Sequence, residues 1–209
     1  MNAISPAERL PDRVGVRLDR LLNAAADGDE DAFVCLLDAC DRQLRRLAAT
    51  LVGAGTGEQL LPEVWRTALE RWSAGTADPQ TVRVWLCTIV TELARARGVI
   101  LGARPDLPAV LPEQRFLPAG HRWAGHWADP PAPWMEATSG PAAAAAVRGA
   151  LGALPSVAAR AVTILRDVDG FSAADVARIL DIDEAAERRL LHYGRGAVRE
   201  ALERVLAPA

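Results

Sequence analysis

Residues 172–206, SAADVARILDIDEAAERRLLHYGRGAVREALERVL, are the stretch that decides the fold. Ser172 stands three residues before Asp175, an S-x-x-D capping box that predicts the start of a helix. A tight turn follows, in which Ile182 is the one apolar residue and Asp183 can cap a second helix. Two helices joined by about three residues indicate a helix-turn-helix, although any helical hairpin can share this spacing.

The residues from Arg17 to Arg97 also predict helices, because apolar side chains recur there every three or four positions. Three apolar stripes run through residues 33–51, 60–72 and 82–93, and none of these segments alternates as a strand would. The face opposite the first stripe is expected to be solvated, and it carries Asp38, Asp41, Arg42, Arg45 and Arg46.

Residues 98–141 separate the two helical parts and contain eight prolines, which is too many for a helix or a sheet. They also hold three tryptophans, so this linker is expected to pack on its own domains or on a partner. We therefore expect an all-α chain with two small helical domains joined by a Pro/Trp-rich linker. Its parts are a flexible N-terminus (1–16), a helical bundle (17–97), the linker (98–141) and a helix-turn-helix domain (142–209).

Composition excludes several classes of protein. The 209 residues carry a formal net charge of -3, so binding to DNA would need a local basic face or a larger partner. No apolar run approaches the length of a membrane span, and three cysteines without CxxC spacing predict reduced thiols in a cytoplasmic protein. We expect no metal, because His121 and His126 near Asp129 lack further ligands. We expect no enzyme and no cofactor, because the sequence shows no Gly-rich phosphate loop and no Ser-His-Asp set.

The C-terminal part also contains residues 165–172 (LRDVDGFS), then Val176-Ala177, Ile179-Leu180 and Leu190-Leu191-His192. The N-terminal part contains Glu63-Val64-Trp65, Val84-Trp85-Leu86 and Leu93-Ala94-Arg95. In this order, the motifs resemble the fourth and second regions of a bacterial RNA polymerase sigma factor of the extracytoplasmic-function (ECF) group. The resemblance covers roughly residues 17–206, and the linker is similar to that of one branch of the group.

The resemblance implies a function and the residues that carry it. The first domain would bind core RNA polymerase and then read the minus-ten element, and the last domain would read the minus-thirty-five element in the major groove. The implied polymerase-binding residues are Leu60, Leu61, Glu63, Val64, Trp65 and Arg66. The implied contacts to promoter DNA are Ser172, Glu184, Arg188, Arg189, His192, Arg195, Arg199, Arg95 and Arg97. An anti-sigma factor is a further expected partner.

The chain also departs from the family pattern. Gln59 and Pro62 replace the usual Asp and Gln, and Pro62 predicts a helix that starts near Leu61 or is distorted. Glu92 replaces the usual Asn, and residues 98–102 replace a usual basic run, so minus-ten DNA would meet less positive charge. Gly194 and Gly196 together cost about 2 kcal/mol of helix propensity relative to alanine. Asp181, Asp183, Glu184 and Glu187 are expected to cluster where DNA would approach. They either repel its phosphates or serve only as helix caps on a solvated face.

Two functions therefore stay open. The chain is either an active ECF sigma factor, or a diverged sigma-like protein that works mainly as a protein-binding or regulatory module with weak or no promoter recognition.

Overall fold

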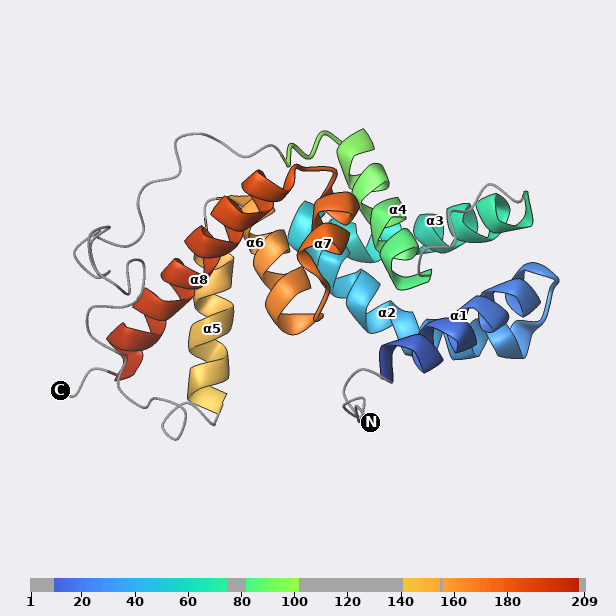
Figure 1. Cartoon of the computed structure of the whole chain (residues 1–209), viewed down its shortest axis with the longest axis horizontal. Helices are drawn as coiled ribbons and strands as arrows, with labels where there is room; N and C mark the ends of the chain where they lie inside the picture. The colour runs from blue at the N-terminus through green and yellow to red at the C-terminus, as the bar shows by residue number, and fades with distance from the viewer. Residues whose placement is uncertain (1–9, 75–81, 102–140, 155, 207–209) are drawn as a thin grey trace, which may run out of the picture.

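The structure, a computed structural model, describes residues 10–74, 82–101, 141–154 and 156–206. Within these ranges the chain forms eight α-helices and no strand, which confirms the all-α class (Figure 1). The helices are α1 (Leu10–Ala26), α2 (Glu30–Val52), α3 (Ala54–Ser73), α4 (Val82–Ala96), α5 (Pro141–Ala153), α6 (Val157–Thr163), α7 (Ala173–Leu180) and α8 (Glu184–Leu206). A single π-helical turn, η3 (Ile164–Val168), continues α6.

The boundaries differ in part from those expected. Helix α1 begins at Leu10, inside the segment 1–16 that the sequence predicts to be flexible. Residues 102–140, which make up most of the predicted linker with its three tryptophans, lie outside the described residues.

Helices α2 and α3 meet at a corner that depends on glycine. Gly53 has a φ of +87°, a backbone conformation that favours glycine, and it ends α2 and precedes α3. Gly57 lies where the two helices touch, because a Cβ there would come within 2.7 Å of the Ala49 backbone nitrogen. The glycines of residues 53–57 therefore create a close helix crossing.

Pro62 does not start α3, so the expected helix start near Leu61 is wrong. Helix α3 already begins at Ala54 and runs through Pro62 to Ser73. Proline removes one backbone N–H donor from the helix. The ring of Pro62 is exposed, so this residue lies on the solvent side of α3. The buried side of the same helix carries Leu60, Leu61 and Val64, and this apolar contact holds it in place.

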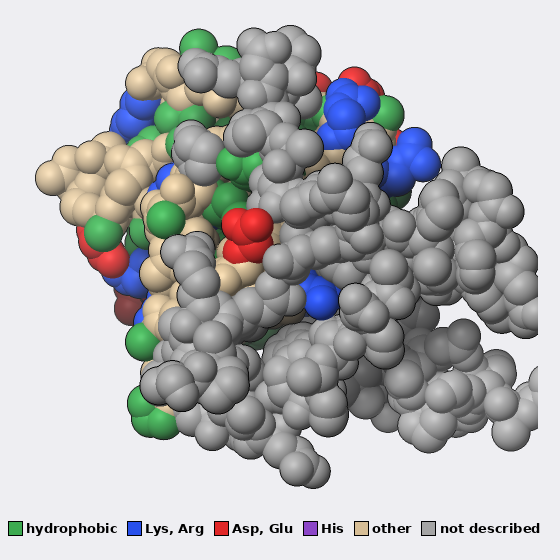
Figure 2. All heavy atoms as spheres, turned by 90° about the vertical axis from the view of Figure 1, so that its left-hand side faces the viewer, with side chains coloured by type: hydrophobic (Ala, Val, Ile, Leu, Met, Phe, Trp, Pro, Cys, Tyr) green, Lys and Arg blue, Asp and Glu red, His purple; other side chains and the backbone are tan. Residues whose placement is uncertain are grey.

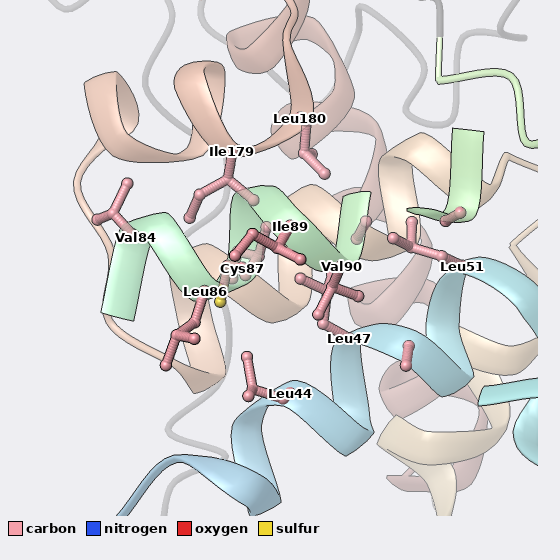
Figure 3. Close-up of a cluster of buried hydrophobic side chains, with 14 of the residues drawn as sticks. Leu44, Leu47, Leu51, Val84, Leu86, Cys87, Ile89, Val90, Ile179 and Leu180 are labelled. Atoms are coloured by element: carbon pink, nitrogen blue, oxygen red, sulfur yellow. The ribbon is translucent and has the colours of Figure 1, made fainter. Parts of the chain in front are cut away.

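One apolar core runs through both helical parts of the chain. Helix α4 lies between α2 and α7, as Figure 3 shows. Ile179 and Leu180 of α7 are fully buried and point toward α4, which presents Val84 and Ile89 on that side (Figure 3). We call the contact of α7 and residues 169–171 with α2 and α4 the seam.

Polar groups reinforce the seam. Arg46 of α2 forms an ion pair with Asp169, whose side chain is only 2% exposed. Arg83 of α4 donates to the Asp169 carbonyl at 3.3 Å and to Gln43 at 3.0 Å, and its guanidinium lies 4.9 Å from the ring centroid of Phe171. The expectation that Arg46 lies on a solvated face is therefore wrong, because its partner comes from the other half of the sequence.

Gly194 of α8 has a packing reason to be glycine. A Cβ at this position would lie 1.9 Å from Thr163 Oγ1 and 3.3 Å from the Ala159 carbonyl oxygen. Thr163 is buried and donates to that same carbonyl at 2.8 Å, so it cannot turn away without losing a hydrogen bond. Glycine therefore allows α6 and α8 to approach closely, and its cost in helix propensity is offset by this contact.

We predict that Gly194→Ala lowers the free energy of unfolding by about 1–2 kcal/mol, because overpacking outweighs the gain in helix propensity. Gly149→Ala is the matched control, since Gly149 lies in α5 with open space around its Cα. This control is expected to raise the free energy of unfolding by up to about 1 kcal/mol. Urea unfolding followed by circular dichroism measures both, and a Gly194→Ala chain as stable as the wild type would contradict the packing argument.

Candidate nucleic-acid interface

Helices α7 and α8 form the two-helix unit that the sequence predicts. The Ser172 hydroxyl accepts a hydrogen bond from the Asp175 backbone N–H at 3.1 Å and donates to the Asp175 carboxylate at 2.6 Å. Asp183 accepts from the Ala186 N–H at 2.6 Å and so satisfies a free donor in the first turn of α8. Ile182 packs against the core between the two helices. Both predicted caps are confirmed.

Helix α8 has a buried face and an exposed face. Ala186, Leu190, Leu191 and Tyr193 are buried against the other C-terminal helices. Most of the predicted promoter contacts of this part of the chain are exposed: Ser172 at the start of α7, and Glu184, Arg188, Arg189, His192 and Arg195 on the exposed face of α8. Arg199 is half-buried. The structure thus brings the basic residues at positions 188, 189, 192 and 195 together on one side of one helix.

Arg195 is already held by a carboxylate. Its Nε and Nη2 donate to the two oxygens of Asp167 at 2.9 and 2.6 Å, a bidentate pair. The hydrogen bond from Asp167 raises the pKa of Arg195. Both side chains are partly exposed, so the pair contributes little to the free energy of unfolding. Its main effect is to orient the Arg195 guanidinium.

Glu187 does not face solvent, so the prediction that it repels DNA is wrong. Its side chain is 1% exposed and forms an ion pair with Arg166 at 3.2 Å. Arg166 also donates to the Phe171 carbonyl at 2.7 Å and so links η3, α8 and the segment before α7. The acidic group that remains at the start of α8 consists of Asp181, Asp183 and Glu184, all of them exposed.

The two predicted minus-ten contacts, Arg95 and Arg97, have partners within the chain. Arg95 donates to the carbonyls of Leu180 at 2.8 Å and Asp181 at 3.1 Å, which are the last acceptors of α7. A cation is favourable there, because the C-terminus of a helix carries a partial negative charge. Arg97 pairs with Glu63 at 2.5 Å. Glu63 is one of the predicted polymerase contacts, so the structure joins two residues that the sequence assigns to different partners.

Of the predicted polymerase contacts on α3, Leu60, Leu61, Val64 and Trp65 are buried in the core. Arg66 is exposed and pairs with Glu70 at 2.9 Å. An open hollow of about 470 Å³ lies between α2 and α3. Apolar and charged side chains line it: Phe33, Leu37, Leu61, Pro62, Trp65 and Leu69 with Asp41, Arg45, Glu58 and Arg66.

Sequence reasoning missed Arg83 and Asp169 as functional candidates. Asp169 belongs to a motif that was recognised, but nothing local indicates that its carboxylate is buried. On the part of the face in Figure 2 that the described residues show, the blue arginine side chains form separate groups. Among the described residues, α8 offers a nucleic acid the basic side chains at positions 188, 189, 192 and 195.

The chain matches no protein-family model and no curated protein. No helix in the described part combines the length and apolar character that crossing a membrane requires. The described residues also bring no three histidine, cysteine or acidic side chains together as a metal-binding group, whereas His121, His126 and Asp129 lie outside them.

We predict that Glu187→Gln lowers the free energy of unfolding by about 1–3 kcal/mol, because Arg166 loses a buried anionic partner. Glu184→Gln removes the same charge from an exposed position in the same helical turn, and its expected cost is about 0.3–1 kcal/mol from the helix dipole alone. Thermal unfolding of the two variants measures the difference. Equal melting temperatures would show that the ion pair of Arg166 and Glu187 does not add to the stability of the fold.

Proposed function

We propose that this chain is a promoter-specificity subunit of bacterial RNA polymerase, a sigma factor of the ECF type that acts in the cytoplasm. In this proposal α1–α4 correspond to the second sigma region and α5–α8 to the fourth. The chain would contribute recognition and no catalysis, because bond formation belongs to the polymerase. An anti-sigma factor would be an additional partner.

The observation that carries the proposal is the capped two-helix unit with a basic exposed face. Helix α8 begins at an Asp cap, directs its apolar residues inward and leaves Arg188, Arg189 and His192 on the outside. A helix of this form fits the major groove of DNA, where arginine recognises guanine edges and phosphates. The negative overall charge is compatible with this role if the polymerase supplies most of the affinity.

Contact with polymerase would involve the outer side of α3. Because four of the six predicted contacts are buried, their role is to shape this surface from below, and Glu63 and Arg66 are the two that reach it. The hollow between α2 and α3 offers apolar side chains with a charged rim, a composition typical of a site for a partner helix.

One observation favours the alternative function, a sigma-like module that binds proteins and reads DNA weakly or not at all. Arg95, Arg97 and Arg195 all form ion pairs within the chain, so three predicted DNA contacts have carboxylate partners already. Exposed pairs of this kind exchange readily, because each contributes only about 0–1 kcal/mol. The two functions therefore differ in whether DNA displaces these carboxylates.

We predict that the chain binds purified core RNA polymerase in a pull-down and directs discrete run-off transcripts from fragmented genomic DNA of the organism that encodes it. Polymerase without the chain is the control. Binding without transcripts would favour a regulatory module that occupies polymerase. A folded chain that gives neither would contradict the sigma-factor function and favour the protein-binding module.

We predict that Arg188→Ala weakens binding to the promoter fragments found in this way by about tenfold, as loss of one arginine contact costs about 1–3 kcal/mol. Association with core polymerase should not change. Arg148→Ala is the matched control, since Arg148 is an exposed arginine of α5, a helix that is not one of the two helices of the helix-turn-helix unit. Fluorescence anisotropy measures the affinities, and equal affinities of the two variants would remove Arg188 from the interface.

A further inference from the structure

Two consecutive residues of η3 hold α8 in place. Helix α6, which η3 continues, packs along α8 (Figure 1). Arg166 pairs with the buried Glu187 at 3.2 Å, and both oxygens of Asp167 accept from Arg195, at 2.9 and 2.6 Å. Glu187 and Arg195 stand eight positions apart in the chain, which is about 12 Å along the helix. The π-helical turn, a feature frequent at functional sites, therefore fixes both the first turn of α8 and one arginine on its exposed face.

The Asp167 carboxylate occupies only one edge of the Arg195 guanidinium. A guanidinium carries five N–H donors in one plane, and Asp167 takes one from Nε and one from Nη2. Within the described residues, Nη1 of Arg195 has no hydrogen-bond partner. The Arg195 side chain is 56% exposed, so its outer edge, formed by Nη1 and Nη2, reaches solvent. Arg195 is therefore an exception among the paired arginines, because DNA can bind this outer edge without displacing the carboxylate.

The outer edge of Arg195 matches one base in the major groove. Its two N–H groups run parallel, as a bidentate contact to the O6 and N7 acceptors of guanine requires. A DNA phosphate is a less suitable ligand, since phosphate binding depends on net positive charge and Asp167 neutralises that of Arg195. The oriented side chain also loses less conformational freedom on binding than a solvated arginine does. The pair therefore favours recognition of a base over attraction to the DNA backbone.

Arg195 lies on the same side of α8 as Arg188. The two arginines stand seven positions apart, which is about two helical turns, and both are exposed. Their separation along the helix axis is about 10 Å, which corresponds to about three base pairs of DNA. A helix that lies in the major groove can therefore bring both side chains to base edges.

We propose that Asp167 is a positioning residue that directs Arg195 to a guanine in promoter DNA, about three base pairs from the base pair that Arg188 contacts. Asp167 itself does not touch the DNA and acts through Arg195. This inference rests on the proposed function and deepens it, because it names one base of the recognised sequence and a residue outside α8 that selects this base.

The experiment selects bound sequences from a library of randomised duplex DNA, with the full-length chain both alone and bound to core polymerase. We expect the wild-type chain to prefer guanine about tenfold at the Arg195 position, as one bidentate arginine contact discriminates to this extent. Asp167→Asn should lose most of this preference, because the Asn amide offers one acceptor and one donor and cannot bind both N–H groups. Arg195→Lys should lose it too, because an ammonium group lacks the planar pair of donors.

Asp38→Asn is the matched control. It makes the same substitution at an exposed position of α2 and removes the same charge from the N-terminal part. The guanine preference of this variant should equal that of the wild-type chain. Melting temperatures of all three variants should stay near the wild-type value, since exposed ion pairs contribute little to the free energy of unfolding.

A modified base tests the contact directly. In a selected duplex, 7-deazaguanine replaces the preferred guanine and removes its N7 acceptor. The wild-type chain should bind this duplex several-fold more weakly than the unmodified one, whereas Asp167→Asn should bind the two equally. Fluorescence anisotropy measures the four affinities.

Three results would overturn the inference. An equal guanine preference of the wild-type chain and Asp167→Asn would show that Asp167 does not position Arg195. Stronger binding of Asp167→Asn to all sequences, with a steeper salt dependence, would show that Arg195 binds a phosphate instead. Weaker binding to all sequences together with a lower melting temperature would assign Asp167 a structural role only.

The proposed function fails in a different way. A folded wild-type chain that enriches no sequence, alone or with polymerase, would overturn promoter recognition and this inference with it. An enriched sequence whose guanine preference persists in Asp167→Asn would leave promoter recognition in place and overturn this inference alone.

Discussion

Asp169 lies where the two helical parts of the chain meet, and the placement of α7 depends on it. Its carboxylate is buried beside Arg46, its carbonyl accepts from Arg83, and its backbone N–H donates to the Ile164 carbonyl at 3.0 Å. Burial raises the pKa of Asp169, and the hydrogen bond from Arg46 offsets part of that rise. A buried charge is costly unless it is paired, so this ion pair selects one arrangement of residues 169–171 against α2.

A series of contacts connects Asp169 to the rest of the C-terminal part. Phe171 lies under the guanidinium of Arg83, and the capped start of α7 comes directly afterwards. The buried pair of Arg166 and Glu187 then ties η3 to the first turn of α8. The exposed face of α8 is therefore oriented mainly by interactions on its buried side.

How far the sequence predicted the site varies from residue to residue. Ser172 and Asp183 were predicted as caps because a capping hydrogen bond joins residues only three positions apart. Glu187 was misread as a surface acid, since its partner Arg166 lies in another element and no periodicity reveals the pairing. Pro62 was misread as a helix start, because propensity carries less weight than the apolar contact that holds α3 against the core. From the sequence, Gly194 was expected only to lower helix propensity, whereas the structure shows that a side chain there would collide with Thr163.

The sequence by itself determined that the described chain is helical, that Ser172 and Asp183 cap helices, and that a tight turn joins α7 and α8. The caps and the turn depend on residues within about one helical turn of each other. Only the tertiary structure decided which charges are buried, which arginines are engaged and that α7 covers α4. The partners Arg46 and Asp169 stand 123 positions apart in the chain. Such a pair forms only when the packing of whole helices brings two side chains together, and that packing depends on shape and volume, which local sequence patterns do not encode.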